Sequence, residues 1–224
     1  MGSLFNLDAP IWVWMSEVAD IIILTFLWWV FCIPVITAGA STTAFYYVMG
    51  KKVRKENTYV LKDFIKSFKQ NFKQSLLITV VMLVACISAS LYAFMTIEGL
   101  LLKATSLKWI IPVTIIFVFE LVNIFSYLWA LLSRFEMKTR VLVKTALVLT
   151  HKHLLTTLAN TFVFVITGYL IFRLPFLIVF APGIIMTLSS FLMQNLFTHY
   201  ITADAEREAV AKAEVIEEEV HIEG

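Results

Sequence analysis

Long runs of residues without a single charge dominate this sequence and limit what it can fold into. The segments 21–50, 75–97 and 174–198 contain no Asp, Glu, Lys or Arg. A helix needs about 20 apolar residues to cross the hydrocarbon core of a bilayer, and each run is long enough. The chain is 60% hydrophobic, whereas soluble globular domains are about 45–50% apolar. These features predict an all-α integral membrane helical bundle.

The first apolar run is too long for one crossing. As a straight helix it would extend about 45 Å, and the hydrocarbon core is about 30 Å thick. Pro34 and Gly39 predict a break, with a second helix starting near Ser41 and capped by Ser41 or Thr42. We expect about five transmembrane helices in a membrane domain over residues 1–198. The predicted spans cover about 16–36, 75–97, 109–133, 154–172 and 174–198.

Lys and Arg residues are concentrated in two of the segments between the predicted spans. Segment 51–73 has eight and segment 134–152 has five, whereas the segments on the other side have only Lys103, Lys108 and Arg173. Loops rich in Lys and Arg stay on the cytoplasmic side of a membrane. Five spans then place the N-terminus outside and the C-terminus inside.

The segment 59–75 has the periodicity of an amphipathic helix. Its apolar positions include Phe64, Phe68 and Phe72, and its basic positions include Lys66, Lys69 and Lys73. One interpretation is an interfacial helix that lies on the anionic surface of the lipid bilayer. The other is a docking face for a partner protein, in which the phenylalanines are the anchors.

Glu120 is the most costly residue within the predicted spans. An ionised carboxylate at the centre of a membrane helix costs about 2.5–3.5 kcal/mol on insertion scales. Asn123 and Tyr127 follow at i+3 and i+7, so the three residues form one polar stripe and a candidate intramembrane polar site. Either the stripe holds helices together by hydrogen bonds, or it relays a proton or cation or lines a substrate path.

Pro182 and Gly183 predict a second helix break, inside the last span. Broken membrane helices free backbone groups that can bind a substrate or ion. The alternative is a packing kink that lets a neighbouring helix approach closely.

Residues 199–224 form an acidic tail, which we expect on the cytoplasmic side. Segment 203–224 contains eight Asp or Glu residues and only two basic residues. The tail is either solvated or a charge-steered docking segment.

The sequence contains no motif that predicts an enzyme. It lacks a P-loop, a G-x-S-x-G elbow, an H-E-x-x-H pair and a glycine-rich dinucleotide turn. His151 and His153 are two residues apart, which on a helix directs them to different faces, so we placed them at the inner headgroup level. We predict no metal site, no cofactor and no nucleic-acid partner.

Three blocks of the sequence resemble a known family. Residues 28–47 read WWVFCIPVITAGASTTAFYY, residues 63–74 read DFIKSFKQNFKQ, and SRFE at 133–136 is followed by KTAL at 144–147. In this order they resemble the YesL-like proteins, the family of unknown function 624. The most specific positions are Pro34, Thr37 and Gly39. Ala40 departs from the pattern, because many members have proline there.

The resemblance implies a small multi-pass protein of a bacterial cell membrane, mainly from Gram-positive species. Such proteins are often encoded beside carbohydrate ABC importers, and their activity is not established. We therefore expect an accessory or regulatory component of carbohydrate uptake that contacts importer subunits. The alternative is a small carrier or channel that acts through the Glu120 region. Association with further copies of the same chain is left open.

Overall fold

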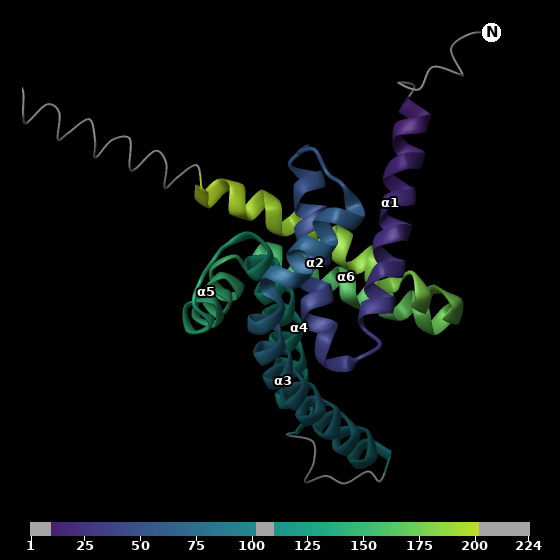
Figure 1. The fold of residues 1–224 in the computed structure, drawn as a ribbon. Helices are drawn as coiled ribbons and strands as arrows, with labels where there is room; N and C mark the ends of the chain where they lie inside the picture. Colours follow the sequence, from purple (N-terminus) through teal and green to yellow (C-terminus); the bar gives the residue numbers. More distant parts are fainter. Residues whose placement is uncertain (1–9, 102–109, 202–224) are drawn as a thin grey trace, which may run out of the picture.

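The computed structural model describes residues 10–101 and 110–201, and every regular element in these ranges is helical (Figure 1). This confirms the predicted all-α class. The helices are α1 (Pro10–Phe31), α2 (Ala38–Val53), α3 (Val60–Leu101), α4 (Ile110–Arg134), α5 (Thr139–Lys152), α6 (Leu154–Arg173) and a C-terminal helix over residues 181–201. Two 3₁₀ turns lie at Val35–Thr37 and Pro175–Val179. The acidic part of the predicted tail, from residue 203, lies outside the described residues.

Within residues 10–101 and 110–201, four helices are long and apolar enough to cross a membrane. The qualifying segments are Trp14–Phe31, Val60–Glu98, Ile110–Arg134 and Leu154–Arg173. They match four predicted spans, so this is a multi-pass membrane protein. The fifth predicted span, 174–198, is not among them. Pro182 lies in the first turn of the C-terminal helix, where proline is tolerated, so the predicted break inside a span is the start of a helix.

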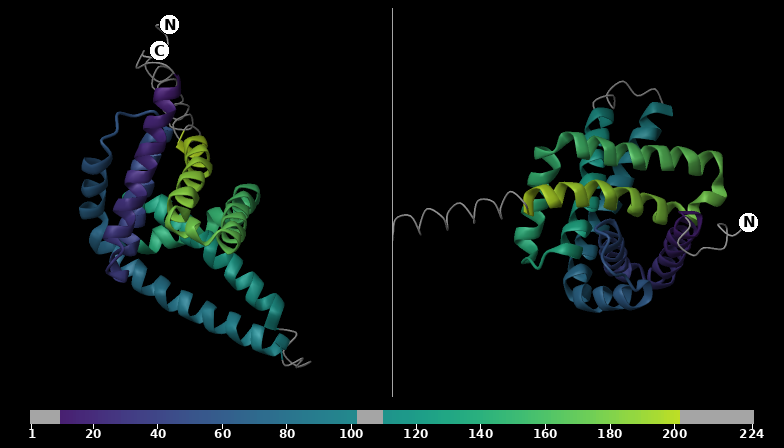
Figure 2. Two further views of the ribbon diagram at one scale, coloured as in Figure 1. Left: turned by 90° about the vertical axis from the view of Figure 1, so that its right-hand side faces the viewer. Right: turned by 90° about the horizontal axis from the view of Figure 1, so that it is seen from above.

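The segment predicted as a separate amphipathic helix is part of a much longer one. α3 runs without interruption for 42 residues, or about 63 Å at 1.5 Å per residue. No proline occurs in this helix and its one glycine is Gly99, so nothing in the sequence ends the helix where the lysine-rich half meets the apolar half. The first half packs on α2, and the second half projects from the centre beside α4 (Figures 1 and 2).

The predicted break at Pro34 is a complete reversal of the chain. α1 ends at Phe31, and the hydroxyl of Thr37 donates to the carbonyl oxygens of Phe31 at 2.6 Å and Pro34 at 2.7 Å, which holds the turn. The prediction that Ser41 or Thr42 caps the next helix is wrong, because α2 begins at Ala38 and both residues lie inside it.

Ion pairs join the N-terminal half of α1 to the end of α2. Lys52 Nζ lies 2.8 Å from a carboxylate oxygen of Glu17 and 2.5 Å from one of Asp20. Burial opposes the charge of Lys52, but the hydrogen bonds that Lys52 donates to these two carboxylates outweigh this effect and raise the pKa of Lys52. α1 and α2 are therefore an antiparallel hairpin.

This hairpin argues for a different orientation from the one that the lysine count predicts. The N-terminus is expected outside if one crossing separates it from the lysine-rich segment 51–73. In the structure Glu17 and Asp20 of α1 contact Lys52, so the N-terminal half of α1 lies beside the end of α2 that leads into that segment. If the lysine-rich side is cytoplasmic, the start of α1 is cytoplasmic as well.

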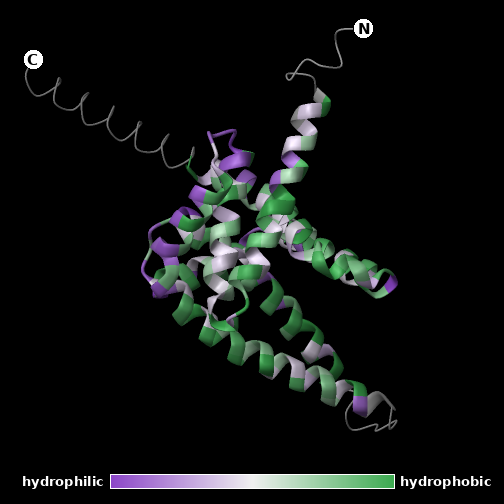
Figure 3. Ribbon diagram, turned by 45° about the vertical axis from the view of Figure 1, so that its right-hand side comes forward, coloured by the Kyte–Doolittle hydropathy of each residue, from purple (hydrophilic) through white to green (hydrophobic). Residues whose placement is uncertain are grey.

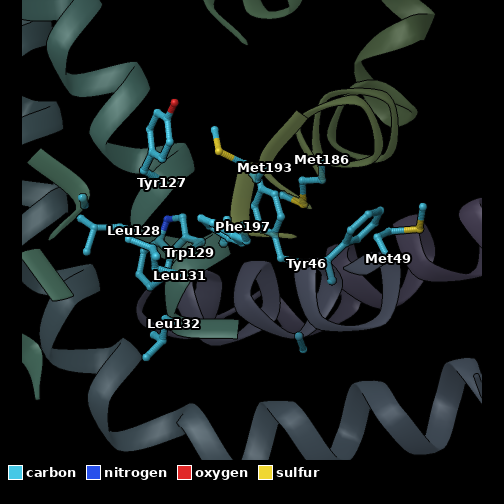
Figure 4. Packing of buried hydrophobic residues seen from close by; sticks show 14 of the residues in the cluster. Tyr46, Met49, Tyr127, Leu128, Trp129, Leu131, Leu132, Met186, Met193 and Phe197 are labelled. Atoms are coloured by element: carbon cyan, nitrogen blue, oxygen red, sulfur yellow. The ribbon is translucent and has the colours of Figure 1, made fainter. Parts of the chain in front are cut away.

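α2 is the centre of the bundle. Eleven of its residues are buried, and they pack with Trp129 of α4 and with Met193 and Phe197 of the C-terminal helix (Figure 4). α6 and the C-terminal helix lie side by side and run in opposite directions (Figure 2). Figure 3 shows that the projecting helices are mostly hydrophobic and that hydrophilic residues gather on one side of the molecule.

Candidate functional site

The predicted polar stripe of α4 is divided between two sites. Asn123 is fully buried, and its amide nitrogen donates to Thr161 Oγ1 at 2.8 Å. Its amide oxygen accepts from Asn160 Nδ2 at 3.3 Å, and the oxygen of Asn160 accepts from Ser189 Oγ at 2.6 Å. Asn123 thus belongs to a buried network that joins α4, α6 and the C-terminal helix, as the helix-joining interpretation predicts.

Tyr127 extends the same kind of contact one turn further along α4. Its side chain is fully buried, and its hydroxyl lies 3.3 Å from Thr157 Oγ1. Thr157 Oγ1 in turn donates to the carbonyl of Thr150 at 2.8 Å, so the hydroxyl chain reaches α5. In Figure 4 the Tyr127 hydroxyl points away from Trp129 and Phe197. Tyr127 therefore separates the polar network from the apolar core.

Glu120 has a different partner, which the sequence did not indicate. Its Oε1 lies 2.7 Å from Nε2 of His151, near the end of α5. Its other oxygen, Oε2, is buried and has no hydrogen-bond partner in the structure. The contact is an ion pair when His151 is protonated. The sequence analysis assigned His151 to the headgroup level, and the structure brings it to the carboxylate instead.

Of the three phenylalanines of the predicted docking face, Phe64 is fully buried, and its ring centroid lies 5.5 Å from that of Phe31. Phe64 is therefore not available to a partner. Phe68 and Phe72 are half-buried, and Phe68 lies 4.9 Å from Phe31 and 5.5 Å from Phe72. Phe31 at the end of α1 thus covers part of this face, whereas Lys66, Lys69 and Lys73 are exposed.

Three residues from distant parts of the chain form a charged junction. Arg54 Nη1 donates to Oε1 of Gln194 at 2.9 Å, and Arg134 Nη1 donates to the same oxygen. Glu56 binds Arg54 with its carboxylate, and this hydrogen bond lowers the pKa of Glu56. Sequence reasoning counted both arginines only as loop charges. The available signal was Gln194, a strongly polar residue within an apolar run.

The region of Pro182 and Gly183 is a packing site. A Cβ on Gly183 would lie 2.1 Å from Thr25 Oγ1 of α1, so only glycine allows this approach. Pro182, Trp28 and Trp29 line an apolar cavity of about 300 Å³. Trp28 donates its indole N–H to the hydroxyl of Thr42, and Trp29 donates its indole N–H to the carbonyl oxygen of Val179. Both indole N–H groups are therefore bonded within the protein. The packing interpretation of this region fits better than substrate binding.

Residues 21–92 match the family described as "Protein of unknown function, DUF624". We call residues 21–92 the DUF624 segment, after the family that they are similar to. The segment covers the second half of α1, the turn, α2 and α3 as far as Tyr92, and the match supports the resemblance to the family of unknown function 624. No curated protein and no solved structure matches the chain.

The DUF624 segment contains the reversal at Pro34 and Thr37, the close approach at Gly39 and the buried Phe64. The polar network around Asn123, the Glu120–His151 pair and two members of the charged junction lie outside it. The family match thus covers the packing of the first three helices and does not include these polar sites.

Proposed function

We propose that this DUF624 protein is a non-enzymatic accessory component of carbohydrate uptake in the cell membrane of a Gram-positive bacterium. In this role it contacts subunits of an ABC importer and tunes their assembly or activity. The resemblance to the YesL-like proteins supports the link to carbohydrate uptake. The structure supports the proposed mode of action, in which the protein binds importer subunits and catalyses no reaction.

One observation carries the proposal: long apolar faces of α1 and α6 are open, while the network around Asn123 and Asn160 is bonded within the protein. Only 11% of the most apolar stretch of α1 and 17% of that of α6 are buried in the protein. Trp14 and Phe26 of α1 are among the exposed side chains. Asn123 and Asn160, by contrast, bind each other and their neighbours. A protein with large open faces and an internally bonded interior is suited to association within the membrane.

The surface that remains open on the first half of α3 is the proposed contact. Leu61 is 57% exposed and Ile65 is 40% exposed. Lys62, Lys66 and Lys69 stand around them. Such a surface fits an importer segment with apolar anchors and acidic neighbours, since rim lysines steer encounter and apolar anchors hold the complex. We propose it as the docking face in place of Phe64, which is buried, and of Phe68 and Phe72, which are half-buried.

Co-isolation from native membranes tests this proposal. Tagged wild-type protein, solubilised gently, should bring down importer subunits that mass spectrometry identifies. Leu61→Ser with Ile65→Ser should reduce their recovery at least about tenfold, because each lost anchor is worth upward of about 1 kcal/mol.

Val148→Ser is the matched control, since Val148 is 60% exposed on α5, outside the proposed contact, and its loss should leave recovery unchanged. Isolation of the wild-type protein alone would contradict the proposal. If the double variant only loosened lipid contact, the lysine-rich half of α3 would be a lipid-binding surface.

The Glu120–His151 pair favours a second candidate, a small carrier that moves protons or cations. Two ionisable groups in contact beside apolar helices are the minimum for a relay. Under the accessory proposal, Glu120→Gln keeps a hydrogen bond to His151 and leaves function nearly intact. A carrier would instead lose all flux in proteoliposomes with the same substitution, while expression stayed normal.

A further inference from the structure

Arg54, Arg134 and Gln194 come from three elements and meet at one point on the lysine-rich side of the bundle. Arg54 directly follows α2, Arg134 is the last residue of α4, and Gln194 lies on the C-terminal helix. Gln194 is 4% exposed, and its oxygen accepts from both guanidinium groups. A Cβ on Gly50 would lie 2.5 Å from Gln194 Nε2, so Gly50 leaves the space that this amide occupies.

The junction has one positive charge more than its bonded partners neutralise. Glu56 compensates Arg54 through contacts of 2.5 Å and 3.3 Å. Arg134 donates to the neutral oxygen of Gln194 and lies over the ring of Phe135, 5.9 Å from its centroid, and neither partner neutralises its charge. A guanidinium group presents five N–H donors in a planar fork that matches a carboxylate or phosphate. The one charge of Glu56 acts on both Arg54 and Arg134, so it does not balance the two arginines, and the fork of Arg134 is the one that a further anion would bind.

We propose that Arg54 and Arg134, held together by the Gln194 amide, form a binding site for a phosphate group. Phosphate carries the charge that the junction lacks, and its oxygens accept bidentate hydrogen bonds from arginine. Arg134 ends the apolar stretch Ile110–Arg134, so the site lies where the membrane meets the aqueous phase. Both the headgroup of an anionic lipid and a soluble phosphate reach this position. The site does not depend on the proposed partner.

Gln194→Glu gives the sharpest test, because it places a carboxylate of the same size between the two arginines. The wild-type protein in nanodiscs of phosphatidylcholine with phosphatidylglycerol should retain phosphatidylglycerol in native mass spectrometry. Gln194→Glu and Arg134→Gln should each reduce retention about tenfold or more, Gln194→Glu without loss of thermal stability. Arg140→Gln, an exposed arginine on α5, should behave like the wild type.

Inorganic phosphate separates the two sources of the anion. Stabilisation of the detergent-solubilised wild type by millimolar phosphate, absent in Gln194→Glu, indicates a soluble ligand. Lipid retention without stabilisation by phosphate indicates a headgroup. Arg134→Lys keeps the charge and should retain less lipid than wild type, which covers the case in which Arg134→Gln does not fold. The proposal is overturned if the wild type shows neither effect, or if Gln194→Glu binds as the wild type does.

Discussion

Phe64→Ala should destabilise this protein by about 3–5 kcal/mol, the usual cost of removing a buried phenylalanine side chain. Phe64 is fully buried, and its ring lies 5.5 Å from that of Phe31 and 6.4 Å from that of Phe68. The substitution leaves a cavity between α3 and the turn that joins α1 to α2. Denaturant titration of the purified protein in detergent micelles would measure the loss in the free energy of unfolding.

Phe94→Ala is the control on the same helix. Phe94 is 61% exposed, so its removal should change the free energy of unfolding by less than about 0.5 kcal/mol. A docking role for Phe64 predicts the opposite pattern, with normal stability and a lost partner. Equal stability of the two variants would show that the first half of α3 is not packed as described.

Gly39→Ala should also be strongly destabilising, by about 3 kcal/mol. A Cβ at this position would lie 2.0 Å from Thr79 Oγ1 and 2.3 Å from the Trp129 ring. Trp129 is 1% exposed, and the Thr79 hydroxyl is bonded to the carbonyl of Ser75 at 2.7 Å. Neither the Thr79 nor the Trp129 side chain can move aside without disturbing the core. Overpacking of a core typically costs about 1–3 kcal/mol.

Gly168→Ala tests the same substitution without the contact. A Cβ on Gly168 would meet no heavy atom within 4 Å, so alanine should stabilise α6 slightly through its higher helix propensity. The comparison can be made from thermal unfolding midpoints in one detergent. If both variants have the same unfolding midpoint as the wild type, α2 does not approach α3 and α4 as closely as the structure shows.

Sequence reasoning predicted the features that depend on local chemistry. Apolar runs of sufficient length predicted four of the spans, and Pro34 predicted a break in the first run, because both follow from the backbone requirements of a helix in lipid. The extent of the reversal was not predictable. A proline predicts where a helix stops, but the contact of Lys52 with Glu17 and Asp20 depends on tertiary packing.

The candidate sites were harder to predict for the same reason. The i+3 and i+7 spacing placed Glu120, Asn123 and Tyr127 on one face, and they do share it. Which neighbour each residue meets depends on how α5 and α6 cross α4, and local periodicity carries no information on this. The junction of Arg134 with Gln194 joins residues 60 positions apart, so local periodicity could not predict this contact either.

The central claim is that α1 and α2 form a hairpin whose open end lies on the lysine-rich side of the membrane. Single-cysteine labelling in intact cells tests it, after replacement of Cys32 and Cys86 by serine. Ser16→Cys should be protected from a membrane-impermeant reagent, as Lys69→Cys should be, and both should react once the membrane is opened. Arg173→Cys should react in intact cells. Reaction of Ser16→Cys from outside, with Lys69→Cys protected, would contradict the hairpin and the account built on it.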